Sequence, residues 1–299
     1  MKNKFKKIVS NLIWKQTKYL LVLPAIVFIV FFLGYPIIYG IYLSFTDFSL
    51  LKPGIFNFVG FSNYLKMFFK DELFWLSFKH SVTLTGSAVA MQYILGLGFA
   101  LSLNQKLPSI GFFRSFSMIT WVIPIAATVV LFRWLVTPNY GLINIIFLRL
   151  GLPQLNTYWF GSIEWAQFLI IIMHVWRNFP FYGVAILASM QAIPEVLYEA
   201  AKIDGASKFQ SFLHITLPGI RYTSAIMIIL HIIFTFNNFD FVFLSTGGGP
   251  VFATEVLPTH VYTQSWLYYS LGYAASIGVV MMVILSLFTF ISLVVSNKK

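Results

Sequence analysis

Polar and aromatic side chains that could bind a solute recur at helical spacing in two apolar segments of the chain. The two stripes, spaced i, i+4, i+7 and i, i+3, i+7, are His174, Asn178, Phe181 and His231, Phe234, Asn238. At these spacings each trio shares one face of a helix. Aromatic rings stack on the C–H faces of sugars while amides bond to hydroxyl groups. Two such stripes that face each other would therefore form a sugar site.

Other interpretations of these residues compete with sugar binding. Asn237 and Asn238 could serve only to bond neighbouring helices, and His231 could be an interior histidine whose bonds are satisfied. Arg177 lies between the polar residues of the first stripe. A cation at membrane depth usually has a permanent partner, so we favour an ion pair with Asp240, and the alternative is an anionic sugar such as a uronate.

The composition shows which elements must position these side chains. The chain has 299 residues, of which 59% are hydrophobic and 10% charged, with a mean hydropathy of +0.82. A soluble domain carries about 25% charged residues, so a water-soluble protein is excluded. The absence of cysteine excludes disulfides, zinc–thiolate sites and cysteine nucleophiles.

Uncharged or nearly uncharged segments of sufficient length predict an all-α integral membrane protein with six transmembrane helices. The predicted spans are 19–46, 81–105, 115–132 with continuation past Arg133, 165–194, 222–239 and 269–295.

The distribution of lysine and arginine predicts the orientation of these spans. With the N-terminus inside, thirteen basic residues fall on the cytoplasmic side and five on the outer side, which places both termini in the cytoplasm. The net charge of +11 is accounted for in this way, so no nucleic-acid partner is expected. We expect residues 1–18 to form a basic cytoplasmic segment, with Phe5, Ile8 and Leu12 on a helix at the inner membrane surface, and residues 19–299 to form the transmembrane domain.

The predicted cytoplasmic loop at 191–219 is long and amphipathic, and its helix start and stop residues predict two short helices. The first begins at about Pro194 and ends at Gly205, a residue suited to a left-handed stop. Ser207 and Gln210 then form a capping box for the second. The loop should therefore be a rigid helical elbow.

The elbow carries more apolar surface than a solvated connector needs. We expect Pro218 to end its second helix. The apolar face comprises Ile193, Leu197, Ala200, Ala201, Phe209 and Phe212. Either the chain's own span ends or a separate partner must cover it.

The stretch EAAKIDGASKFQSFLHITLP within this elbow resembles the signature loop of binding-protein-dependent ABC importer permeases. All seven signature positions are filled, by Glu199, Ala200, Ala201, Gly205, Ile215, Leu217 and Pro218. In that family the loop sits in a groove of a separate cytoplasmic ATPase. The resemblance implies that these seven are ATPase-coupling residues, and Glu199 could offer a charge-assisted bond to a basic residue of that partner.

A second group of motifs resembles the carbohydrate-uptake branch of this family and is similar to the larger permease of maltose transporters. The motifs are FPF at 179–181, FNNFD at 236–240 and TGGGP at 246–250. The resemblance implies a type I ABC importer permease fold in the bacterial cytoplasmic membrane. It also implies a sugar or oligosaccharide substrate, a second permease subunit, an ABC ATPase dimer and an extracytoplasmic solute-binding protein. The substrate contacts it implies are Asn178, Phe181, His231, Phe234 and Asn238.

The chain contains no phosphate-binding loop of the GxxxxGK[ST] type, no H-E-x-x-H and no G-x-S-x-G, so we expect no enzyme activity, no metal and no cofactor in this chain. ATP and magnesium would belong to the partner ATPase. Two alternatives to a permease are an ion-driven secondary sugar carrier, with Asp240 and His231 as a proton relay, and a membrane scaffold. The elbow argues against both.

Overall fold

The computed structural model describes residue 17 and residues 19–52, 54–105 and 110–297. The predicted basic segment, with Phe5, Ile8 and Leu12, lies outside the described residues except for Thr17. The described chain is helical, with one isolated bridge between Thr46 and Phe58. Its elements are η1 (Val30–Gly34), α2 (Tyr35–Leu43), α3 (Ser62–Lys70), α4 (Glu72–Leu103), α5 (Ile110–Ser117), α6 (Ile119–Val122), α7 (Ile125–Leu135), α8 (Leu142–Arg149), η2 (Pro153–Leu155), η3 (Trp159–Gly161), α9 (Ala166–Gln191), α10 (Glu195–Ile203), α11 (Lys208–Ser211), η4 (Phe212–Thr216), α12 (Leu217–Phe236), α13 (Asp240–Ser245), α14 (Leu257–Tyr262), η5 (Thr263–Leu267) and α15 (Leu271–Asn297).

By length and composition, five described helices could cross a membrane, and a bent pair brings the number to six. The helices are Tyr19–Leu43, Glu72–Leu103, Ala166–Gln191, Lys208–Phe236 and Leu271–Val294, and the pair is Ile110–Val122 with Ile125–Leu135. The predicted all-α, six-span fold is thus confirmed. The second span starts at Glu72 instead of Ser81 because a charge such as Lys79 limits how deep a helix can be immersed, and does not limit how far the helix extends.

The third span is not the single helix that the sequence predicts. Its two helices meet at an angle of 94°. Ile123 has ψ 130° and Pro124 has ψ 142°, both extended values. Proline has no N–H to donate and disfavours the helical conformation of the residue before it, so the helix breaks at this pair.

The prediction that Pro218 ends the second elbow helix is wrong. Helix continues from Lys208 to Phe236, through α11, η4 and α12. In the π-helical turn η4, Leu217 N–H bonds to Phe212 O five residues back. Pro218 follows at the second position of α12. At a position where the hydrogen-bond register is already changing, the missing proline N–H does not stop the helix.

The described chain forms two compact units, residues 1–67 with 264–280, and residues 68–263 with 281–299. In the first unit, the turn after α2 is bonded to the start of α15 through Gly272 N–H and Phe48 O at 3.0 Å. Asn63 Nδ2 also donates to Ser44 O and Thr46 O at 2.9 and 2.8 Å. This network holds α3 against the end of α2.

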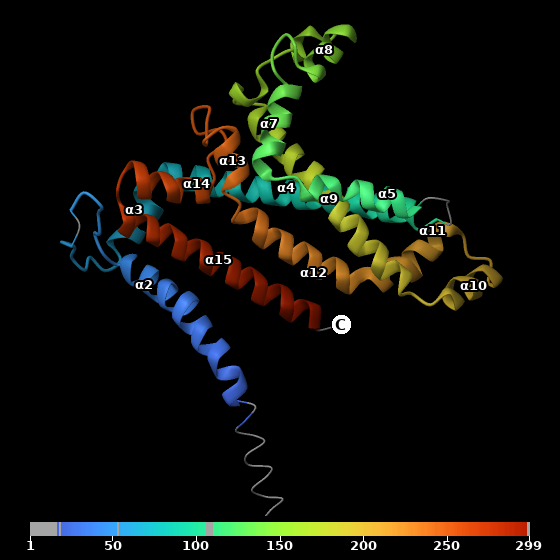
Figure 1. Ribbon diagram of the computed structural model, residues 1–299, viewed down its shortest axis with the longest axis horizontal. Helices are drawn as coiled ribbons and strands as arrows, with labels where there is room; N and C mark the ends of the chain where they lie inside the picture. The colour runs from blue at the N-terminus through green and yellow to red at the C-terminus, as the bar shows by residue number, and fades with distance from the viewer. Residues whose placement is uncertain (1–16, 18, 53, 106–109, 298–299) are drawn as a thin grey trace, which may run out of the picture. The chain divides into compact units, whose positions relative to one another are not determined.

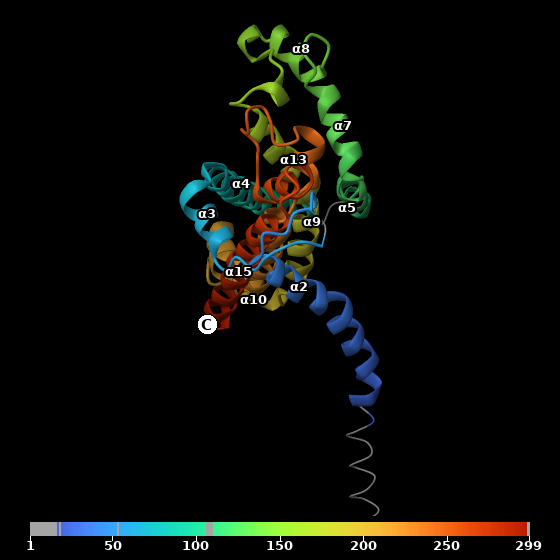
Figure 2. The ribbon, with the colours of Figure 1, turned by 90° about the vertical axis from the view of Figure 1, so that its left-hand side faces the viewer.

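The second unit is built on α4, α9 and α12, which lie side by side (Figure 1). Figure 2 shows α7 leading from this pack to α8, which stands clear of it. Apolar side chains of this unit form two buried clusters, one around Ile170, Met173 and Phe241 and one around Tyr182, Ile186 and Ile220. Between helices, Gln92 Nε2 donates to His174 O at 3.1 Å and Tyr93 Oη donates to Ser224 Oγ at 3.1 Å.

Small residues allow α4 and α9 to approach closely. A Cβ added at Gly96 would collide with Tyr182 Cβ and lie 3.1 Å from Gly183 N. A Cβ at Gly183 would collide with the Phe99 ring. Because apolar side chains gain little by leaving lipid for protein, close backbone packing of this kind is what holds membrane helices together.

The glycine-rich loop between α13 and α14 covers a carboxyl group. Glu255 is 2% exposed, and its Oε1 has no hydrogen-bond partner among the described residues. Gly248 has φ +92°, and a Cβ there would collide with the Glu255 carboxylate. Burial raises the pKa of Glu255 to about 7, opposed by a hydrogen bond from the Thr259 hydroxyl. The loop therefore favours the protonated acid.

We expect Gly96→Ala to destabilise the protein by about 1 to 3 kcal/mol, because the added methyl has no room between α4 and α9. The measurement is thermal unfolding of the purified protein in detergent. Gly98→Ala is the matched control, since a Cβ there meets nothing within 4 Å. Equal unfolding temperatures for the two variants would contradict tight packing at this crossing.

A second expectation concerns pH. Because the folded pKa of Glu255 is above the unfolded value of 4.5, stability is greatest below that value and falls as pH rises through about 7. The loss is at most about 3 kcal/mol. Glu255→Gln removes the titration, so its unfolding temperature should decline less between about pH 5 and 8. Glu164→Gln, at an exposed site, should keep the wild-type slope, and identical slopes for all three proteins would refute the assignment.

Candidate functional site

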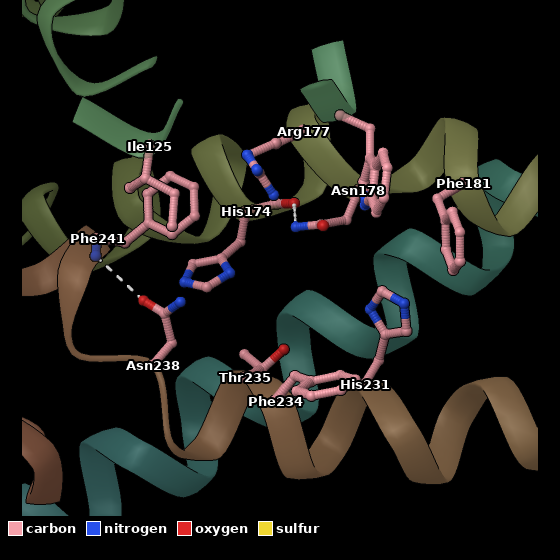
Figure 3. Close-up of a pocket in the computed structure, with 11 residues that line it drawn as sticks. Ile125, His174, Arg177, Asn178, Phe181, His231, Phe234, Thr235, Asn238 and Phe241 are labelled. Carbon is pink, nitrogen blue, oxygen red and sulfur yellow. Dashed lines mark hydrogen bonds between the residues drawn. The ribbon is translucent and has the colours of Figure 1, made fainter. Parts of the chain in front are cut away.

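A cavity of about 260 Å³ lies between α9, α12 and the broken third span (Figure 3). Its lining consists of Trp121, Ile125, His174, Arg177, Asn178, Phe181, His231, Phe234, Thr235, Asn238 and Phe241. The five residues implied as substrate contacts are all in this set, and so are Arg177, the candidate for an anionic sugar, and His174 from the first predicted stripe. The structure thus brings the two stripes together, and their role in binding stays a prediction.

The polar groups of α9 face the cavity with part of their bonding capacity unused. Asn178 Nδ2 donates to His174 O at 2.8 Å, one turn back in the same helix. This bond leaves the Asn178 carbonyl oxygen as an acceptor. His174 is buried, and its Nε2 has no hydrogen-bond partner among the described residues. Its ring packs on Phe241, with centroids 4.2 Å apart.

The polar groups at the end of α12 complete the opposite wall. His231 is 8% exposed and packs between Tyr182 and Phe181, at ring-centroid distances of 4.4 and 5.9 Å. Asn238 Oδ1 accepts from Phe241 N–H at 3.1 Å at the start of α13, which leaves the Asn238 NH₂ group as a donor. Phe234 is 67% exposed and lines the cavity.

Arg177 does not form the ion pair that the sequence favours. Within the described residues no ion pair joins it to Asp240. Its Nε donates instead to Ile123 O at 3.3 Å, the carbonyl freed where the third span breaks. The cavity lining contains this cation and no carboxylate. His231 lines the cavity and Asp240 does not, so the cavity does not bring together the two residues of the alternative proton relay.

Sequence reasoning missed the contribution of the third span. Trp121 stacks on Phe181, with centroids 5.1 Å apart and planes 11° apart, and Ile125 lines the same wall. The available signal was Pro124, because a proline within an apolar span marks a break, and broken backbone at membrane depth occurs where it is buried in protein or lines a cavity. Thr235 and Phe241 also join the lining.

The elbow has the two helices expected of it. α10 begins after Pro194, and Gly205 has φ +77° at its end, where Ala206 N–H bonds to Ala201 O at 2.8 Å. The Ser207 and Gln210 capping box is present. Among the seven signature residues, Glu199, Ala200, Gly205 and Pro218 are exposed, whereas Ala201, Ile215 and Leu217 are half-buried.

The apolar face of the elbow is only partly covered by the chain itself. Ile193 is partly buried and packs against the cluster around Tyr182, Ile186 and Ile220, and Ala201 and Phe212 are half-buried. Leu197, Ala200 and Phe209 are exposed, Phe209 by 67%. Packing against the chain's own spans therefore accounts for one part of this face and leaves the rest open.

Together, apolar spans around a polar and aromatic cavity define a multi-span membrane transport subunit. Residues 92–299 match the model of the family described as binding-protein-dependent transport system inner membrane component. The chain belongs to this family. It is therefore a multi-pass permease component of a binding-protein-dependent ABC importer, and nothing in the comparisons supports an ion-driven carrier.

Relatives extend over nearly the whole chain. It is 35% identical over 296 residues to the trehalose/maltose transport system permease protein MalF of Thermococcus litoralis, covering 96% of this chain and 97% of that protein. It is 33% identical over 262 residues to the sulfoquinovosyl glycerol transport system permease protein SmoG of Agrobacterium fabrum, covering 88% and 84%. A chain of a bacterial ABC transporter involved in the import of the acidic polysaccharide alginate has the same fold, with a TM-score of 0.83, 22% identity, and coverage of 98% and 99%.

Proposed function

We propose that this chain is a permease subunit that forms half of the translocation pathway of an ATP-driven importer for a sugar or oligosaccharide. The observation that carries the proposal is the cavity in which the stripes of α9 and α12 face each other. The names of the relatives above, a trehalose/maltose permease and a sulfoquinovosyl glycerol permease, support a carbohydrate substrate.

The chemistry of the cavity suits a carbohydrate. Rings of Trp121, Phe181 and Phe234 offer apolar faces for the C–H surface of a sugar. Asn178 keeps an acceptor and Asn238 keeps a donor, which together match the dual character of a hydroxyl group. Arg177 adds a positive charge toward any acidic group of the sugar.

The elbow at 191–219 is proposed to couple these spans to a separate ATPase dimer. Its exposed apolar residues and Glu199 would dock in a groove of the ATPase, which holds ATP and magnesium. Closure of the ATPases would then move the elbow and switch the spans from inward-open to outward-open. This chain would supply no catalytic residue and no cofactor.

The proposal also implies a topology for the chain and a set of partner subunits. Both termini and the elbow would be cytoplasmic, with residues 1–18 as a basic inner segment and 19–299 as the transmembrane domain. A second permease subunit would complete the pathway, and a solute-binding protein would deliver sugar on the outer side.

Phe234→Ala should lower sugar uptake by about fivefold, the effect of losing one aromatic stacking contact. The side chain is largely exposed, so the change should leave the fold intact. The measurement is uptake of radiolabelled maltose and trehalose by proteoliposomes that contain the assembled importer. Leu230→Ala, on the same helix and outside the cavity lining, is the control, and equal kinetics for Phe234→Ala and wild type would remove Phe234 from the pathway.

Glu199→Lys and Gly205→Asp should each abolish uptake while the protein still inserts in the membrane. The first reverses an exposed charge of the docking surface, and the second forces a side chain into the left-handed conformation. The measurements are uptake and copurification of the ATPase. Lys208→Glu reverses a charge in the same elbow outside the signature and should be tolerated. Normal transport by both signature variants would argue against docking through this elbow.

A further inference from the structure

A side-chain hydrogen bond connects the two limbs of the elbow, the first being residues 191–205 with α10 and the second being α11, η4 and the first residues of α12. The Tyr198 hydroxyl and Thr216 Oγ1 are 2.9 Å apart. Tyr198 lies in α10, directly before the signature Glu199, and is half-buried. Thr216 is 4% exposed and is the last residue of the π-helical turn η4, immediately before α12. The bond thus joins the first limb to the start of the fifth span.

Packing between the limbs near this bond is local: Ile193, just before α10, lies so close to Gly219 in α12 that a Cβ added at Gly219 would collide with the Ile193 side chain. A groove of about 690 Å³ separates the limbs, with Ile193 and Leu197 on the side of the first limb and Ile215 and Pro218 on the side of the second. Where side chains do not interdigitate, dispersion contacts are lost and an element can move with little resistance. Together with the contact of Ile193 on Gly219, the bond between Tyr198 and Thr216 therefore helps to set the angle between the limbs.

The surroundings make this bond costly to break. With Thr216 almost fully buried, loss of the tyrosine hydroxyl would leave a buried threonine hydroxyl without that partner, which costs more than an exposed hydrogen bond is worth. The π-helical turn is the weakest point of the continuous helix that runs from α11 into α12, because an N–H there bonds to the carbonyl five residues back and not four. The hydrogen bond between Tyr198 and Thr216 stabilises the chain at this turn.

We propose that Tyr198 is a positioning residue for coupling, whose bond to Thr216 locks α10 to the start of α12 so that a displacement of α10 becomes a displacement of the fifth span. The inference rests on the proposed docking of the elbow on an ATPase. It adds that the elbow and the fifth span move as one body. Without the bond, α10 would follow the ATPase while α12 lags behind.

The absence of native cysteine allows a direct test. Cysteines at Lys202, which lies one turn after Tyr198 in α10, and at Tyr222 in α12, both exposed, would carry spin labels in the full importer with its ATPase. Electron–electron distance measurements would be made without nucleotide and with ATP and magnesium. In the otherwise wild-type chain the label distance should be the same in both states. Tyr198→Phe should produce a second, shifted distance in the ATP-bound state. The ratio of the shifted to the original population should be about fivefold higher than in the otherwise wild-type chain, which is the effect of one neutral hydrogen bond on a two-state equilibrium.

Thr216→Val removes the same hydrogen bond from the other side. Combining it with Tyr198→Phe should therefore add nothing further, because both substitutions remove the same bond. Tyr140→Phe, which removes a hydroxyl from an exposed loop residue, should leave the distances unchanged. ATPase copurification should persist in all of these variants. If the labelled wild-type chain bound no ATPase, the proposed function would fail. If it bound the ATPase and Tyr198→Phe and Thr216→Val kept its single distance, or if the two effects were additive, the positioning role would be refuted while the proposed function stood.

Discussion

The second unit depends on one constraint, that backbone polar groups at membrane depth must find partners inside the protein. An unbroken helix meets it automatically, so each break in a span requires a replacement donor or acceptor. The break at Pro124 frees the carbonyl of Ile123, and Arg177 donates to it from α9. At the end of α12, Asn237 Nδ2 bonds to Ile233 O at 2.9 Å, and Asn238 accepts from Phe241 N–H. Of these three side chains, Arg177 and Asn238 also line the cavity.

This double role explains the chemistry of the cavity. Arg177 and Asn238 each spend part of their bonding capacity on the backbone and keep the rest for the cavity. A side chain that is fixed by one bond loses little further freedom when it makes a second, which favours binding over an arrangement of freely rotating groups. The stacked pair of Trp121 and Phe181 restricts the wall in the same way, since it joins the broken span to α9. The interpretation of the asparagines as structural and the interpretation as binding residues are thus compatible.

How far the sequence could predict the structure is shown by its two critical prolines. The spans and the capping box follow from hydropathy and local hydrogen bonding, which act within a few residues and can be read from neighbours in the chain. Pro124 and Pro218 look alike in sequence, yet the first breaks its helix and the second does not. The difference lies in context. At the first break, Arg177 from a distant helix donates a hydrogen bond to the carbonyl of Ile123, whereas the π-helical turn before Pro218 allows the helix to continue. The pairing of Arg177 with Ile123, and not with Asp240, could not be predicted for the same reason.

The continuous helix through Pro218 determines how the proposed coupling could reach the cavity. The helix runs for 29 residues from Lys208 to Phe236, about 43 Å at 1.5 Å per residue. Its first turns belong to the elbow and its last turns carry His231 and Phe234. A loop at Pro218 would absorb a displacement of the elbow, because a flexible segment changes conformation at little cost, whereas a hydrogen-bonded helix resists both compression and bending. In a chain that ended its elbow helix at Pro218, force from an ATPase would need another path to the cavity. Here the backbone itself provides it, and the only compliant point is the π-helical turn.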